Sequence, residues 1–137
     1  MNCYRNLWVA LALLFCISCQ GNTNKQDADL FNDYVHIKPD SILSEKDIEL
    51  KYAIMDITIE NMAIKNNKFV FKLSKREFLK TGIPLKYYDL IIRNVKDNNK
   101  FIRNSRKAGD NLFDNLDAMW EETKNEYYNS RSQVDSN

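Results

Sequence analysis

The single histidine, His36, is the side chain best suited by its type to acid–base or metal chemistry. Asp33 and Asp40 lie close to it along the chain. A protein zinc site takes three or four ligands from cysteine, histidine or carboxylate side chains, and this neighbourhood offers one imidazole. We therefore interpret His36 as a solvated surface histidine, and we predict neither a metal site nor a cofactor.

Nucleophilic and nucleotide chemistry leave no motif in the sequence. A Ser–His–acid triad would have to use His36, and no G-x-S-x-G elbow marks its serine. The chain has only three glycines, and they do not form the kind of loop that holds phosphate groups. Neither acyl-transfer nor nucleotide chemistry is therefore predicted.

Carboxylates are numerous, and in the C-terminal part they recur at intervals of four, three and four residues, at Asp110, Asp114, Asp117 and Glu121. Glycoside hydrolysis needs two carboxylates held a set distance apart. Intervals of three and four are instead typical of one face of a helix. We interpret these acids as the solvated face of an amphipathic helix, and we predict that the protein is not an enzyme.

The segment from Lys65 to Lys107 is basic, with 13 Lys or Arg against three Asp or Glu, and aromatic residues are interleaved. In a cytoplasmic protein this composition favours nucleic-acid binding. Three other interpretations stay open: attraction to anionic lipid headgroups, docking of an acidic protein surface, and cover by the acidic C-terminal helix. Residues 46–107 carry a net charge of +8, and the flanking residues 19–45 and 108–137 carry −3 and −5.

The N-terminus has the pattern of an export signal. Arg5 precedes an apolar run from Leu7 to Ile17, and the chain turns polar directly after Ser18 and Cys19. A charged start followed by an apolar run of this length is typical of a secretory signal peptide. The run is too short to span a bilayer, which takes roughly 20 apolar residues.

A small residue followed by cysteine at the end of such a run resembles the lipobox of bacterial lipoproteins. Ser18 matches the small position and Cys19 the lipidated cysteine, while Cys16 stands where the family usually has leucine. The resemblance covers residues 1–19 only. It implies that residues 1–18 are cleaved, that Cys19 carries acyl chains such as palmitate, and that these chains hold the protein to a membrane of the bacterial cell envelope, on the periplasmic side or at the outer membrane. The alternative is an ordinary secretory signal that is cut near Ser18.

Cleavage would leave 119 of the 137 residues, which is enough for one domain with a core. Cys19 would be the last cysteine in the chain, and a lipidated sulfur is neither a nucleophile nor part of a disulfide. Because the protein is expected outside the cytoplasm, we predict no nucleic-acid partner.

The first part of the exported chain is predicted to be a tether followed by a helix. Residues 19–40 are polar and typical of a flexible linker, with apolar residues near the end that could dock on the domain. The first helix starts at a capping box of Ser44 and Asp47 and ends at Asn66-Asn67. Its apolar stripe consists of Ile48, Tyr52, Met55, Ile59 and Met62.

Alternation in residues 68–73 suits a short strand, which needs a pairing partner that the sequence does not identify. Ser74 and Glu77 form a second capping box, which opens a short helix that ends at Gly82. The next helix begins at Pro84 and is broken at Asp97-Asn98-Asn99. Its predicted inner stripe is Tyr88, Ile91, Ile92 and Val95.

The last helix is predicted over residues 105–128, with a disordered tail over residues 129–137. Its apolar positions are Leu112, Phe113, Leu116, Met119, Trp120, Thr123 and Tyr127. The predicted fold is therefore mainly α: a small bundle of about four helices over residues 41–128, with room for one short β element, after a cleaved signal peptide and a flexible tether.

These features favour a non-catalytic protein-binding module of the cell envelope with one protein partner. One concrete form is an immunity protein that neutralises a periplasmic toxin. An alternative is a structural or accessory subunit of a secretion or conjugation machine, and the least favoured is an enzyme acting on cell wall or lipid. The residues expected to bind the partner are Lys86, Tyr87, Arg93, Lys96, Asp114, Asp117 and Glu121.

Overall fold

The computed structural model describes residues 34–134. The predictions for the signal peptide, for lipidation of Cys19 and for the first part of the tether fall on residues 1–33, outside the described residues. Residues 135–137, the end of the predicted tail, lie outside them as well.

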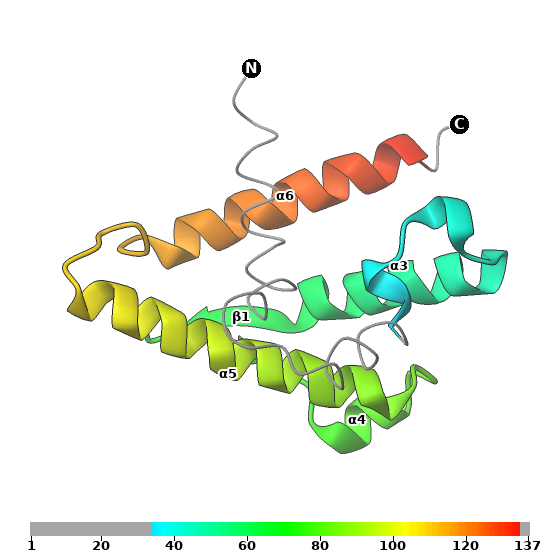
Figure 1. The fold of residues 1–137 in the computed structure, drawn as a ribbon, viewed down its shortest axis with the longest axis horizontal. Coiled ribbons are helices and arrows are strands. Elements are labelled where there is room, and N and C mark those ends of the chain that lie inside the picture. The colour runs from blue at the N-terminus through cyan, green and yellow to red at the C-terminus, as the bar shows by residue number, and fades with distance from the viewer. Residues whose placement is uncertain (1–33, 135–137) are drawn as a thin grey trace. The chain divides into compact units, whose positions relative to one another are not determined.

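The described chain is mainly helical and contains one two-stranded antiparallel sheet, so the predicted fold class is confirmed (Figure 1). None of its helices combines the length and the apolar composition that crossing a membrane requires. In chain order the elements are η2 (Val35–Ile37), η3 (Asp40–Ile42), α3 (Glu45–Asn61), β1 (Met62–Lys65), β2 (Lys68–Phe71), α4 (Lys75–Leu79), α5 (Leu85–Lys107) and α6 (Leu116–Val134).

These elements form two compact units. The α3 unit consists of residues 34–62 and 71–93, and the α6 unit of residues 63–70 and 94–134, as far as the structure describes them. Helix α5 is continuous, and its first nine residues belong to the α3 unit while the rest belong to the α6 unit (Figure 1).

Helix α3 begins as predicted, because the Ser44 hydroxyl caps it by accepting a hydrogen bond from the Asp47 N–H (3.2 Å). Its most deeply buried side chain is Ile54, at 1% exposure. The hydroxyl of Thr58, also buried, donates to the Ile54 carbonyl (2.7 Å), so its burial leaves no donor unpaired.

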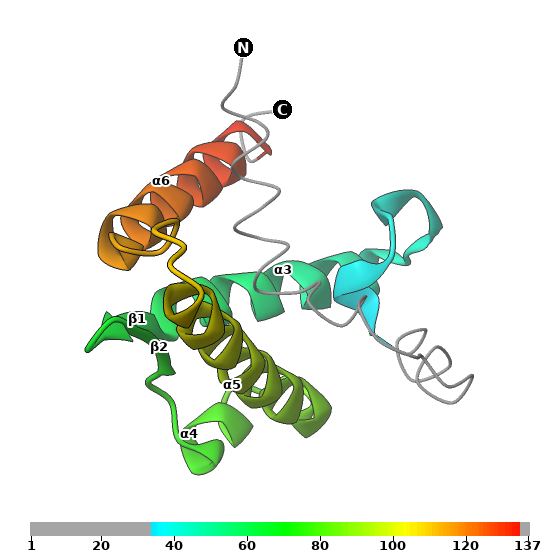
Figure 2. The ribbon, with the colours of Figure 1, turned by 60° about the vertical axis from the view of Figure 1, so that its left-hand side comes forward.

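The predicted end of this helix is wrong. Helix α3 ends at Asn61, and Met62 to Lys65 form strand β1. Asn66 and Asn67 both have positive φ, 51° and 59°, which is the backbone of a two-residue type I′ hairpin turn. The chain therefore reverses and pairs β1 with β2, which supplies the partner that the predicted strand needed (Figure 2).

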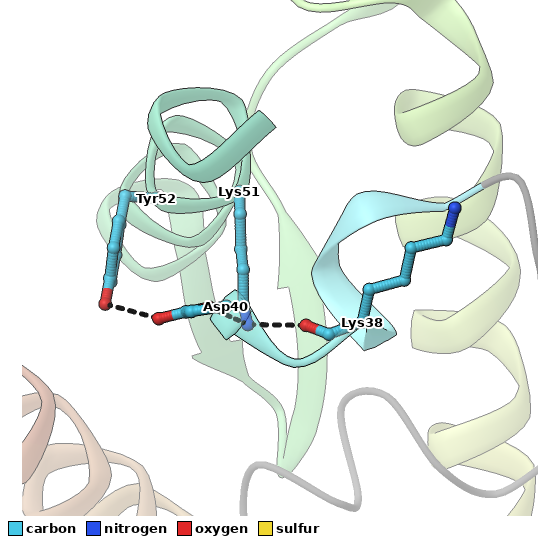
Figure 3. A network of polar contacts seen from close by, with 4 residues as sticks. All are labelled: Lys38, Asp40, Lys51 and Tyr52. Atoms are coloured by element: carbon cyan, nitrogen blue, oxygen red, sulfur yellow. Dashed lines mark hydrogen bonds and ion pairs between the residues drawn. The ribbon is translucent and has the colours of Figure 1, made fainter. Parts of the chain in front are cut away.

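A polar network fixes the segment before α3 to that helix (Figure 3). The Lys51 ammonium donates to the Lys38 carbonyl (2.9 Å) and pairs with Asp40 (2.7 Å). The hydroxyl of Tyr52 lies 3.5 Å from the other carboxylate oxygen of Asp40. These contacts, with packing of η2 on α3, hold the end of the predicted tether against the α3 unit.

Helix α4 begins with the predicted capping box. The Ser74 hydroxyl accepts from the Glu77 N–H, and the Glu77 carboxylate accepts from the Ser74 N–H (2.8 Å). Behind the cap, Phe78 is fully buried and meets Phe71 and Tyr88 edge-on, with ring centroids 6.4 and 5.4 Å away. These aromatic rings, packed edge-on, form the core of this part of the α3 unit.

The predicted break in α5 is also wrong. The helix continues through Asp97-Asn98-Asn99 to Lys107, and Asn98 is 2% exposed. The chain leaves the helix after Lys107 through Gly109, whose φ is +83°. The N–H groups of Gly109 and Asp110 donate to the carbonyls of Arg106 and Ser105, which are the two bonds of a Schellman motif.

The longer helix also changes which face of α5 is buried. Tyr87, Leu90, Ile91 and Ile102 are buried, whereas Ile92, predicted to face inward, is 39% exposed. The predicted helix ended at Asp97 and so did not include Ile102. Ile102 is buried, and its position shows which side of α5 faces the core. The predicted stripe is therefore correct at Ile91 and wrong at Ile92.

Helix α6 starts at Leu116 rather than at residue 105, because residues 105–107 complete α5. Its buried face matches the prediction at Leu116, Trp120, Thr123 and Tyr127, while Leu112 is 57% exposed. The helix continues through residues 129–134, which the sequence predicts to be part of a disordered tail.

Candidate functional site

The three predicted acidic residues lie on one exposed face of the α6 unit. Asp117 and Glu121 stand one turn apart on α6, and Asp114 lies in the turn just before it. All three are exposed, while Trp120, on the adjoining side of α6, is buried. We call Asp114, Asp117 and Glu121 the acidic face.

Two further residues belong to this surface. Lys124 forms an ion pair with Glu121 (2.6 Å). Tyr128 follows Glu121 at an interval of seven residues, so it shares the same side of the helix, and it is 44% exposed. Sequence reasoning missed Tyr128, although its interval from Glu121 was visible.

The predicted basic residues are exposed but belong to different units. Lys86 and Arg93 lie in the α3 unit, and Lys96 lies in the α6 unit. The Lys86 ammonium is 5.2 Å from the centroid of the Tyr34 ring and 5.4 Å from that of Tyr87, within the range of a cation–π interaction.

Tyr87 is not a surface residue. Its side chain is 1% exposed, its hydroxyl oxygen accepts a hydrogen bond from the Val35 N–H (3.2 Å), and its ring meets that of Tyr34 edge-on. A tyrosine packed in this way offers no area to a partner, so its inclusion among the partner-binding residues is corrected. It instead docks Tyr34 and Val35, the end of the predicted tether, on the α3 unit.

His36 is half-buried beside the same rings, so its interpretation as a solvated surface histidine is wrong. Burial and, to a smaller extent, the positive charge of Lys51 together lower the pKa of His36 from 6.5 to about 4. Its ring lies edge-on to those of Tyr34 and Tyr87. The imidazole is therefore neutral at pH 7 and packs as an aromatic side chain.

A pocket of about 300 Å³ opens in the α6 unit between the β1–β2 turn and the last turns of α5. Its lining residues from α5 share one helix face, at intervals of three, one, three and one residues. The lining consists of Asn67, Lys68, Asn99, Ile102, Arg103, Arg106 and Lys107. We call it the cationic pocket, because four of these seven side chains are basic and none is acidic.

Two side chains hold the walls of the cationic pocket together. The Asn99 amide accepts from the Phe69 N–H and donates to the Phe69 carbonyl, both at 2.8 Å, as a neighbouring strand would do. The Arg106 guanidinium donates to the carbonyls of Asn67 (3.2 Å) and Phe113 (2.6 Å). The hairpin, α5 and the loop before α6 are thereby joined by hydrogen bonds.

Sequence reasoning did not find Asn67, Asn99 or Arg106. An Asn-Asn pair between two alternating segments is a hairpin signal and could have revealed the turn. The bonds of Asn99 and Arg106 reach backbone groups 30 and 39 residues away, so no local pattern indicates them.

Among residues 34–134, no group of three or more histidine, cysteine, aspartate or glutamate side chains is placed to hold a metal ion. Comparison of the chain with models of protein families, with curated proteins and with solved structures finds no match.

Proposed function

We propose that this protein is a lipoprotein of the bacterial cell envelope, anchored through Cys19, whose folded part binds one protein partner without catalysing a reaction. The observation that carries the binding part of the proposal is the acidic face, Asp114, Asp117 and Glu121, exposed on one side of α6. Lipidation rests on the residues at the signal cleavage position, Ser18 and Cys19.

The position of the acidic face suits recognition because the adjoining side of α6 is fixed in the core. Leu116, Trp120 and Tyr127 are each less than 5% exposed, so the helix cannot rotate without losing this burial. The carboxylates of Asp117 and Glu121 therefore keep a fixed spacing on this helix, and Asp114 lies in the turn directly before it. A rigid array requires little ordering when a partner binds, which favours affinity.

The chemistry of the acidic face indicates a partner with a basic surface. Opposite charges across an interface accelerate association and select against partners of the wrong sign. Tyr128 adds an exposed aromatic ring, a side chain that often contributes much of the binding energy of an interface. A cationic toxin is one such partner, and in that case the protein acts as an immunity protein.

The test is capture of a partner from detergent-solubilised envelopes by the full chain carrying a C-terminal tag. The variant Asp114→Asn/Asp117→Asn/Glu121→Gln removes three negative charges from the acidic face. We expect one stoichiometric protein with a basic surface on the unaltered chain, and at least about tenfold less of it on the variant, because close charge pairs at an interface contribute several kcal/mol.

The matched control is Glu45→Gln/Glu49→Gln/Glu60→Gln, which removes the same charge from exposed positions of α3. This control should capture the partner as the unaltered chain does. If both variants captured less partner by the same factor, net charge rather than the acidic face would control binding. If both captured as much partner as the unaltered chain, the acidic face would not be the binding site. Neutralisation of the purified partner's toxicity by the chain would identify an immunity protein.

Anchoring has a separate test. Cys19→Ala should abolish incorporation of a labelled palmitate analogue and move the chain from the membrane fraction to the soluble fraction. Ser130→Ala, a change far along the chain, should leave both measurements unaltered. Labelling that persists in Cys19→Ala would contradict the assignment of the lipid to Cys19.

A further inference from the structure

The cationic pocket has a charge opposite to that of the acidic face and includes none of its residues. Lys68 lies on one wall, and Arg103 and Lys107 lie on the facing side of α5, all exposed. Arg106 is half-buried between them. The pocket is therefore a separate feature of the molecule with its own binding chemistry.

The positive charges of the pocket are not neutralised by the protein around them. Among the described residues, none of Lys68, Arg103, Arg106 and Lys107 forms an ion pair with a carboxylate. Arg106 donates to two carbonyl oxygens, which carry no net charge, and its buried Nε has no hydrogen-bond partner among the described residues. A half-buried cation without a counter-charge is unfavourable, so an anion in the pocket would be stabilised.

The pocket is also rigid at its base. Arg106 is held at both terminal nitrogens, and the Asn99–Phe69 pair fixes the hairpin that carries Lys68. Arg103 and Lys107 are exposed on the same helix face and are free to close over a ligand at the rim. A fixed cation at the base with adaptable cations at the rim lowers the ordering cost of binding.

We propose that the cationic pocket binds a phosphate group. Guanidinium and ammonium groups together suit phosphate, because arginine offers paired donors to two oxygens and lysine adds a point charge. A volume of about 300 Å³ holds a phosphate together with a small attached group. The phosphate is carried either by a soluble molecule or by the headgroup of an anionic phospholipid.

Two charge-matched variants of the full chain test this site. Arg103→Gln/Lys107→Gln removes two rim cations without touching the bonds of Arg106. Lys96→Gln/Lys100→Gln removes two exposed cations from the same helix outside the pocket. The first probe is inorganic phosphate, titrated at constant ionic strength against chloride in neutral detergent, with the backbone amide shifts of residues 67–69 and 99–107 as the readout.

The second probe is a vesicle of phosphatidylglycerol and phosphatidylcholine, compared with a vesicle of phosphatidylcholine alone. Because the apolar N-terminal run can enter any bilayer, the measured quantity is the difference in bound fraction between the two vesicles. This difference isolates the contribution of the anionic headgroup.

We expect Arg103→Gln/Lys107→Gln to weaken binding by about tenfold, and Lys96→Gln/Lys100→Gln to weaken it by no more than about twofold, since direct charge-assisted hydrogen bonds are lost in the first case only. Such a difference with inorganic phosphate supports the site with a soluble ligand. The same difference with phosphatidylglycerol vesicles alone supports it with a lipid headgroup.

Equal weakening by the two variants would overturn the proposal, because it would show a general attraction to basic surface. Absence of binding to both probes would overturn it as well. The variants of the acidic face leave the cationic pocket unaltered, so failure of the phosphate site and failure of the protein-binding function are distinguished.

Discussion

The contacts inside the α3 unit differ in kind from the contacts inside the α6 unit. In the α3 unit, segments distant in the sequence meet mainly through aromatic rings. Phe78 meets Phe71 and Tyr88, and Tyr87 meets Tyr34. An aromatic side chain also takes part in a long-range hydrogen bond here, because the Tyr87 hydroxyl oxygen accepts from the Val35 N–H.

In the α6 unit, polar side chains make the corresponding long-range connections. Asn99 pairs with the backbone of Phe69, and Arg106 bonds to the backbone of Asn67 and Phe113. Apolar contact exists there too, since Phe69 and Trp120 meet edge-on at 5.7 Å. The hairpin is nevertheless placed on α5 by hydrogen bonds of defined direction.

The difference has a physical consequence. Aromatic burial depends on area and tolerates small shifts, whereas a two-bond amide contact holds one register of the strand. The unit in which polar side chains place the hairpin on α5 is the unit that contains the cationic pocket. Polar connections thus keep charged side chains in place beside a solvent-exposed concavity.

The largest expected effect comes from the aromatic core of the α3 unit. Phe78→Ala should lower the free energy of unfolding by about 3–5 kcal/mol, because it removes a fully buried ring and leaves a cavity. Denaturation in urea, followed by circular dichroism, measures this loss.

The neighbouring Leu79 provides the control, since it is 55% exposed. Leu79→Ala should change the free energy of unfolding by less than about 1 kcal/mol. A loss for Phe78→Ala no larger than that of Leu79→Ala would contradict the view that aromatic burial holds the α3 unit together.

The next effect concerns the polar connection in the α6 unit. Asn99→Ala should lower the free energy of unfolding by about 2 kcal/mol, because the N–H and C=O of Phe69 would both lose their partner. Amide hydrogen exchange should show faster exchange at Phe69 and its strand neighbours.

Asn104→Ala removes the same side chain from an exposed position on the same helix. It should change stability by no more than about 0.5 kcal/mol. If Asn99→Ala and Asn104→Ala changed the free energy of unfolding equally, the hydrogen bonds of Asn99 would contribute no stability, and only the helix propensity of asparagine would matter.

A smaller effect tests whether the rings around His36 exclude water. The folded-state pKa of His36, about 4, lies below the ordinary value of 6.5, so the unfolded state binds the proton more tightly. The corresponding stability is complete above pH 6.5 and is lost as the pH falls toward 4. We expect a loss on the order of 1 kcal/mol, because solvent screens a half-buried group.

The measurement compares the unfolding free energy of the native chain and His36→Gln between pH 7 and pH 4. The charge that acts on the imidazole is that of Lys51, and it is present in both proteins. Subtracting the two profiles isolates the histidine. If the difference in unfolding free energy between the two proteins did not change with pH, water would reach the imidazole in the folded state.

The smallest effect is local to the cap of α4. Hydrogen bonds from the hydroxyl and the N–H of Ser74 hold the pKa of Glu77 below its ordinary value, and Lys80 contributes least to that lowering. Ser74→Ala should raise the pKa of Glu77, and Lys80→Gln should raise it less. Titration followed by NMR measures both, and the reverse order would mean that charge rather than the cap controls this carboxylate.

The fold class and the core of α6 could be predicted from the sequence because they depend on local patterns. Ser74 and Glu77 form their cap within one turn, and Leu116, Trp120 and Tyr127 follow helical spacing. The exposure of the acidic residues on α6 followed from the same spacing. These features need no information about segments far along the chain.

The errors arose where a local signal competes with a distant partner. Asp97-Asn98-Asn99 resembles a helix break because asparagine has low helix propensity, but Asn98 is buried and Asn99 bonds to β2. Tyr87 resembles a surface aromatic because it stands among basic residues, but its hydroxyl meets the backbone of Val35.

By itself, the sequence determined the mainly helical class and the caps of α3 and α4, because each depends on residues within a few positions of one another. Only the tertiary structure decided that Met62 begins a strand, that α5 continues to Lys107 and that four cations surround one pocket. The placing of the hairpin against α5, which forms the pocket, depends on hydrogen bonds between residues 30 or more positions apart. Such bonds have a cost in chain entropy that only the folded chain as a whole can offset, so no short stretch of sequence reveals them.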